Sequence, residues 1–196
     1  MPASLQMRSS FSAVFVVALT LAVLVSACGG SESDSHAKAL YKTYRATEDR
    51  RDEAESRLRE AFADISAAAQ GEDRAGVIAA AKRGQAAIED IDGFLSAELE
   101  AANGLREVTE VSQDAAKLAE GLERSRDSLA LIAKELEIAL DDPLLATRGK
   151  EVNDLAKEAT DLAVEGELLV RRADRAIALA LGLEPRLDQM FTTTSG

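Results

Sequence analysis

The sequence has few of the residues on which most catalytic and metal sites depend. Its 196 residues include one Cys, one His and no Trp. A single cysteine excludes an intrachain disulfide and a thiolate metal cage, and a single histidine excludes any site that needs two imidazoles. With only two Tyr and five Phe, stacking platforms for sugars or bases are scarce.

Positive charge is also in short supply. Lys and Arg number 23 against 35 Asp and Glu, which gives a formal net charge of −12. A chain of this charge repels phosphate backbones, so we expect no nucleic-acid partner. Hydrophobic residues make up 46% of the chain and charged residues 30%, a composition typical of one ordinary domain with a core.

The amino-terminal segment is apolar and short. It runs from Phe11 to Leu24, is preceded by the basic Arg8, and contains 14 residues. As a helix it reaches about 21 Å, whereas the hydrocarbon core of a membrane is about 30 Å thick. A basic residue followed by a short apolar stretch favours a secretory signal over a membrane span.

The sequence Val25-Ser26-Ala27-Cys28 follows this stretch and places the only cysteine directly after two small residues. It resembles the lipobox of bacterial lipoproteins. The resemblance implies that residues 1–27 are a signal peptide removed just before Cys28. It also implies that Cys28 carries a diacylglyceryl group on sulfur and an acyl chain, such as palmitate, on its new amino terminus.

Several acyl chains at Cys28 would anchor the protein stably to a membrane. We therefore expect a lipid-anchored protein on the extracytoplasmic side of a cell membrane or an outer membrane. Residues 28–35 are mainly small and polar, which predicts a lipidated cysteine followed by a flexible tether.

Beyond the tether, apolar residues recur at spacings of three and four in four segments, 37–68, 77–102, 108–139 and 145–180. Their predicted ends are set by turn and capping residues. Helix carboxyl ends are predicted at Gly71, Asn103-Gly104 and Gly182. Asp73 is typical of an amino-terminal cap. Asp142-Pro143 predicts the start of the fourth helix.

Four long apolar stripes with short connections bury themselves best against one another. The sequence therefore predicts an all-α fold, an elongated antiparallel four-helix bundle with heptad-like stripes over residues 36–182. Residues 183–196 are predicted to form a carboxyl-terminal tail. Gly84 in the second stripe would allow a neighbouring helix to approach closely.

Some residues on the predicted core side are unusual there. Arg51 interrupts the first stripe; it either extends to solvent, pairs with an acid on a neighbouring helix, or belongs to a polar layer that fixes the register. Tyr41, Tyr44 and Phe62 are interpreted as filling the bundle. The alternative is a site for an apolar or aromatic ligand between the helices.

Asp90, Asp92 and Gly93 match part of a calcium-binding loop. In that register the first and twelfth positions fall on Ile88 and Leu99, so both anchoring carboxylates are missing. We therefore interpret the acidic pair as part of a solvated helical face.

The remaining acids and the histidine lead to similar interpretations. Glu158, Asp161 and Glu165 share one helical flank, but a di-metal bundle would need Glu-x-x-His pairs. His36 lies near the tether without a predictable partner, which favours an exposed, structural role. We expect Asp and Glu to lie mainly on the outer faces of the bundle.

These features predict no catalytic, cofactor-binding or metal-binding residues. We expect a non-enzymatic envelope lipoprotein that acts as a helical scaffold or interaction module for a protein or cell-wall partner. The alternative is a small-molecule or cation-binding lipoprotein that uses the bundle interior or the acidic surface.

Overall fold

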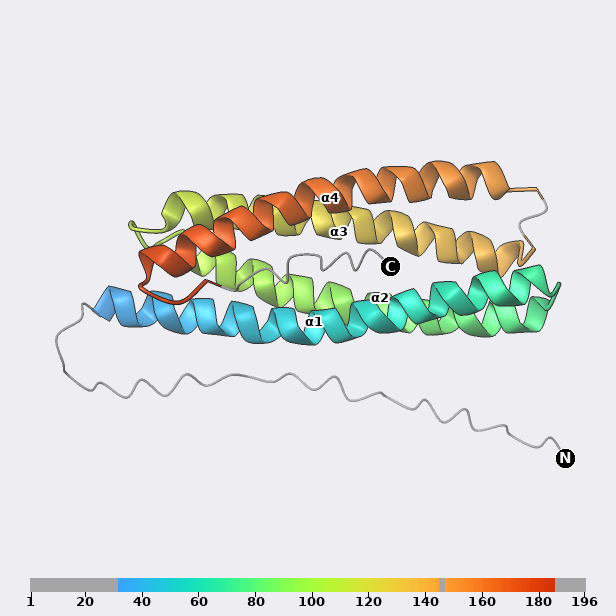
Figure 1. Cartoon of the computed structure of the whole chain (residues 1–196), viewed down its shortest axis with the longest axis horizontal. Helices are drawn as coiled ribbons and strands as arrows, with labels where there is room; N and C mark the ends of the chain where they lie inside the picture. Colours follow the sequence, from blue (N-terminus) through green and yellow to red (C-terminus); the bar gives the residue numbers. More distant parts are fainter. Residues whose placement is uncertain (1–31, 145–146, 186–196) are drawn as a thin grey trace, which may run out of the picture.

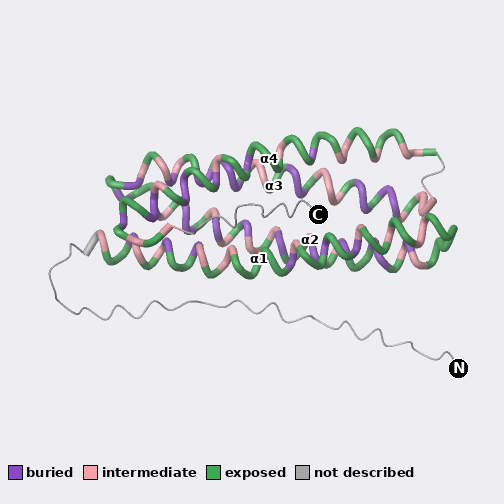
Figure 2. Tube along the Cα trace, in the orientation of Figure 1, coloured by how far each residue is buried: buried purple, intermediate pink, exposed green. Residues whose placement is uncertain are grey.

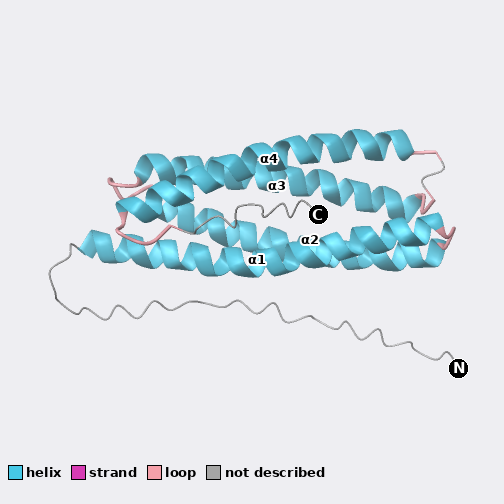
Figure 3. Ribbon diagram, viewed as in Figure 1, coloured by secondary structure: helices cyan, strands magenta, loops and turns pink. Residues whose placement is uncertain are grey.

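The computed structural model describes residues 32–144 and 147–185, which form four long helices (Figure 1). These are α1 (Glu32–Gln70), α2 (Arg74–Leu105), α3 (Ser112–Asp141) and α4 (Gly149–Ala180). They lie roughly along one axis and alternate in direction, and the described residues outside them form loops and turns (Figure 3). The predicted all-α, elongated four-helix bundle is confirmed. The predicted signal peptide, Cys28 and most of the predicted tail lie outside the described residues.

Two predicted helix ends are confirmed by their hydrogen bonds. The backbone N–H of Gly76 donates to Asp73 Oδ1 at 3.0 Å, so Asp73 caps the amino end of α2. At the end of α4, Gly182 adopts a left-handed conformation with φ of 66°, and the N–H of Leu183 donates to the carbonyl of Ala178 at 2.8 Å. A glycine in this conformation ends a helix at no steric cost.

The predicted start of the fourth helix at Asp142-Pro143 is wrong, because α4 begins at Gly149. Asp142 instead follows α3, where its Oδ2 accepts hydrogen bonds from the backbone N–H of Thr147 at 3.0 Å and from its hydroxyl at 2.9 Å. The carboxylate that was expected to cap a helix therefore closes the loop between α3 and α4.

Smaller differences affect other helix ends. α1 begins at Glu32, so the last four residues of the predicted tether are helical. α2 continues through Asn103-Gly104 to the buried Leu105, and α3 begins only at Ser112. Val108 and Val111, predicted as the first stripe residues of the third helix, are buried in the α2–α3 connection.

Each helix packs most closely against its neighbour in the chain: α1 against α2, α2 against α3, and α3 against α4. Small residues permit two of these contacts. A Cβ on Gly121 would lie 2.8 Å from the carbonyl oxygen of Gly166, and a Cβ on Gly166 would lie 2.8 Å from that of Gly121. A Cβ on Gly84 would lie 2.8 Å from Leu136 Cδ1. Gly84 therefore allows the close approach that the sequence predicts.

The amino-terminal half of α4 is the least covered helical segment (Figure 2). Its predicted stripe is only partly correct, since Leu155, Leu162 and Leu169 are half-buried. Complete burial in α4 is concentrated in its second half, at residues such as Val170 and Ile177. Among the four described helices, α3 alone packs closely along α4, which leaves most of the first half of α4 exposed.

Candidate functional site

Polar side chains lie inside the bundle between α1, α2 and α4. We call Tyr41, Tyr44, Arg45, Arg51, Glu98 and Asp174 the interior polar cluster. They extend from the middle of α1, at Arg51, toward the end of the bundle where α1 starts and α4 ends. The described Asp and Glu lie mainly on the outer faces, as the sequence predicts, but Glu98 and Asp174 are exceptions, at 0% and 8% exposed.

Asp174 of α4 binds two side chains of α1. Tyr41 Oη donates to Asp174 Oδ1 at 2.7 Å, and Arg45 Nη1 donates to Asp174 Oδ2 at 2.7 Å. Arg45 Nε also lies 3.2 Å from Glu48 Oε2 on its own helix. Burial, reinforced by the hydrogen bond to Asp174, raises the pKa of Tyr41 well above its usual value. The tyrosine therefore stays a neutral donor, and both carboxylate oxygens of Asp174 have partners.

Arg51 of α1 lies beside Glu98 of α2. Its Nε is 3.2 Å from Glu98 Oε1 and 3.8 Å from Glu55 Oε1. Of the three alternatives for Arg51, the structure confirms pairing with an acid on a neighbouring helix. The contact is an ion pair without hydrogen-bond geometry, because Arg51 Nε and both Glu98 oxygens have no hydrogen-bond partner among the described residues.

Burial dominates the chemistry of Glu98. It raises the pKa of this carboxyl to about 7, although the nearby Arg51 acts in the opposite direction. The buried hydroxyl of Tyr44 likewise has no hydrogen-bond partner in the described chain. The part of the cluster around Glu98 thus holds a carboxyl whose pKa lies near neutral pH. It also holds buried polar atoms, on Glu98 and Tyr44, that accept or donate no hydrogen bond within the described chain.

A third buried acid, Glu135 of α3, lies outside the cluster. It is 7% exposed, and burial raises its pKa to about 7. The sequence contains a signal for all three acids. Glu98 lies three residues after Leu95 and four before Ala102. Asp174 lies four residues after Val170, and Glu135 lies four before Ala139. By this helical spacing each acid occupies a core position of its stripe.

The aromatic residues singled out in the sequence separate into two locations. The rings of Tyr41 and Tyr44 are 6.0 Å apart and both are buried. Phe62 is half-buried, and it lies 18 residues beyond Tyr44 on the same helix, about 27 Å along the axis. The three side chains therefore do not line one common ligand site.

The acidic pair of the partial calcium motif lies within α2 and makes contacts between helices. Asp90 accepts a hydrogen bond from Arg57 of α1 at 2.9 Å, and Asp92 accepts one from Arg126 of α3 at 2.8 Å. The two carboxylates therefore bind arginines on opposite neighbours. His36 is exposed near the start of α1.

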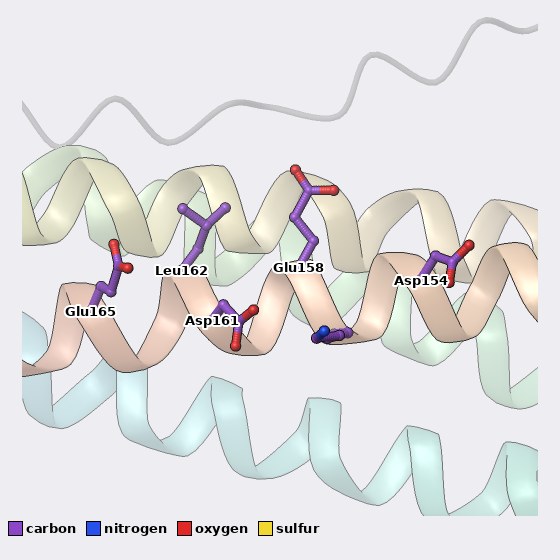
Figure 4. A pocket seen from close by; sticks show the side chains of 6 residues that line it. Asp154, Glu158, Asp161, Leu162 and Glu165 are labelled. Atoms are coloured by element: carbon purple, nitrogen blue, oxygen red, sulfur yellow. The ribbon is translucent and has the colours of Figure 1, made fainter.

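Glu158, Asp161 and Glu165 are exposed on α4, as the sequence interpretation has it. With Asp154 they line a shallow, open depression whose described walls come from α4 alone (Figure 4). Asp154 pairs with Lys150 of its own helix at 2.6 Å, and Glu165 pairs with Arg124 of α3. Across residues 32–144 and 147–185, no three His, Cys, Asp or Glu side chains are grouped to hold a metal ion.

None of the described helices combines the length and the apolar character that a membrane crossing requires. Cys28, the predicted lipid attachment site, lies outside the described residues. Comparisons of the chain with protein-family models, with curated proteins and with solved structures find no match.

Proposed function

We propose that the protein is a non-enzymatic lipoprotein of the bacterial cell envelope that acts as a helical spacer and interaction module. Cys28 carries the lipid, and α1 begins four residues later, at one end of the bundle (Figure 1). At 39 residues, α1 is about 58 Å long. An anchor at Cys28 would therefore hold one end of a rod and leave its long sides available to a partner.

The observation that carries the interaction role is the surface of α4. Large apolar side chains are exposed there at Val164, Leu168 and Leu179, with exposed fractions of 51%, 50% and 59%. The half-buried Leu162 and Leu169 lie beside them on the same helix. Grouped apolar side chains on an otherwise charged helix are typical of surfaces that contact another protein.

Position-specific photo-crosslinking in the native envelope tests this role. A photoreactive residue would replace Leu168 in the full chain, and a matched variant would carry it at the exposed Lys82 of α2. We expect a discrete crosslinked product from position 168 and none from position 82. Equal crosslinking at the two positions, or none at either, would contradict an interaction surface on α4.

A second candidate function is the binding of a small polar molecule or a cation inside the bundle. The observation that favours it is the set of buried atoms without hydrogen-bond partners, Tyr44 Oη and both oxygens of Glu98. Native mass spectrometry of the gently purified full chain tests it. A retained species that is lost in Glu98→Gln, together with a lower melting temperature after its removal, is the expected result. A chain of bare mass that melts at the same temperature after dialysis would exclude this function.

A further inference from the structure

One exposed stripe runs along most of α4. Its members follow one another at alternating spacings of four and three residues and are all exposed: Asp154, Glu158, Asp161, Glu165, Leu168, Arg172, Arg175 and Leu179. We call this set the α4 outer stripe. The first four members are acids and two of the last four are arginines, so its charge reverses along the helix. Leu168 lies at the change of sign.

Four charges of the α4 outer stripe are unpaired in the part of the chain that the structure describes. Glu158, Asp161, Arg172 and Arg175 form no ion pair with any residue that the structure describes. Exposed arginines elsewhere bind acids on a neighbouring helix; Arg83, for example, pairs with Asp64 at 2.6 Å. The stripe therefore presents separate acidic and basic segments, with Val164 and Leu168 exposed near its middle.

We propose that the α4 outer stripe pairs with the same stripe of a second copy of the chain in an antiparallel, two-fold symmetric arrangement. With the axis between Glu165 and Leu168, Arg172 lies opposite Asp161 of the second copy, and Arg175 lies opposite Glu158 of the second copy. Symmetry repeats both ion pairs. A parallel arrangement would place acids against acids and arginines against arginines, so the charge pattern selects the antiparallel one.

The apolar residues fit the same register. The two copies of Leu168 lie close to the axis, with Val164 on one flank of the stripe and the half-buried Leu162 and Leu169 on the other. In this register each Leu168 lies opposite Glu165 of the second copy, so apolar and acidic side chains meet at the centre. Glu165 is already paired with Arg124 of its own chain. The intermolecular ion pairs flank this centre on both sides, as in an antiparallel coiled coil. A single pair of helices makes a small interface, and lipid anchoring would raise the local concentration that it needs.

The pairing rests on the interaction role proposed above and specifies its partner. It also constrains the arrangement at the envelope. Antiparallel α4 helices place the amino ends of the two α1 helices at opposite ends of the dimer. Both anchors then reach one membrane only when the rods lie along its surface; otherwise they reach two facing membranes.

Charge reversal tests the pairing in the full lipidated chain, reconstituted in lipid vesicles, in which the sulfur of Cys28 carries its diacylglyceryl group and leaves no native thiol. Asp161→Arg and Arg172→Glu are each expected to weaken the homodimer at least about tenfold, because like charges then face each other twice. Mixing the two variants restores opposite charges at both contacts, so a heterodimer is expected. Circular dichroism checks that both variants stay helical. Failure of the mixture to dimerise would overturn the proposed register.

Disulfide trapping tests the position of the axis in the same lipidated chain. Leu168→Cys is expected to form a covalent dimer on oxidation. Arg175→Cys is the control, since in this register its two copies lie about 25 Å apart along the helices. Equal trapping at both positions would overturn the arrangement. If residue 168 crosslinks only to a different protein in the envelope, self-pairing is wrong and the interaction role stands.

Discussion

Asp174 and Glu98 are two buried carboxylates of one interior polar cluster, and their surroundings differ. Asp174 receives a hydrogen bond on each oxygen, from Tyr41 and Arg45. Glu98 is completely buried beside Arg51 and receives none from the described chain. Asp174 is therefore a structural link between α1 and α4, whereas Glu98 has unused hydrogen-bonding capacity and a pKa of about 7.

This difference matters because α1 and α4 approach each other less closely than the helix pairs adjacent in the chain. Asp174 supplies a specific polar contact across this weak seam. Glu98 lies on α2, which is already packed closely against α1. The first carboxylate thus joins the two helical hairpins, and the second lies within one of them.

The largest expected effect is that of removing the charge beside Glu98. At pH 9.5 the carboxyl of Glu98, with a pKa of about 7 beside Arg51, is ionised. Arg51→Met forces this buried carboxyl to stay charged without a counter-ion or to bind a proton, and the free energy of unfolding should fall by about 3 kcal/mol. Chemical denaturation measures this change. Adding Glu98→Leu removes the stranded charge and should recover most of the loss. An Arg51→Met protein as stable as the parent would show that the ion pair does not compensate Glu98.

Asp174→Ala should cost less, about 2 kcal/mol. It strands the Tyr41 hydroxyl, but Arg45 keeps its contact with Glu48. Tyr41→Phe is the matched control, which removes one of the two hydrogen bonds and should cost about 1 kcal/mol. Thermal and denaturant unfolding measure both variants. Equal effects of the two substitutions would mean that the Arg45 contact adds nothing to the α1–α4 seam.

The pH dependence of stability should reveal the buried acids Glu98 and Glu135. Burial raises the pKa of Glu98 and Glu135 to about 7, so between about pH 4.5 and 7 the folded protein binds more protons than the unfolded chain. The free energy of unfolding therefore falls as pH rises through this window, by about 3 kcal/mol for each group. Denaturation at pH 5 and pH 8 measures the fall. Glu98→Gln should reduce the fall; an unchanged slope in Glu98→Gln would contradict the assignment.

The fold was largely predictable from the sequence because most predicted stripe positions of α2 and α3 are buried, as are Ala54, Leu58 and Ala61 of α1. The stripe of α4 was predicted less well, since Leu155 and Leu162 stay half-exposed where α3 alone packs closely on the helix. The start at Pro143 failed for a local reason: Asp142 binds Thr147 across the loop.

The interior polar cluster was only partly predictable. Arg51 was recognisable as an anomaly because it interrupts an apolar stripe, and Glu98 and Asp174 occupy core positions by spacing. Their partners depend on the register between helices distant in the chain. Tyr41 and Asp174 are 133 residues apart, and periodicity along a single helix does not fix such a pairing.

The central claim of a lipid-anchored helical module is tested most directly by labelling with a fatty-acid analogue. Cells producing the parent chain or Cys28→Ser would be labelled, and the protein would be isolated and its mass measured. We expect label on the parent and none on the variant, which should keep residues 1–27 and have a higher polypeptide mass. Equal labelling of the two proteins, or processing of both at the same position, would contradict the account.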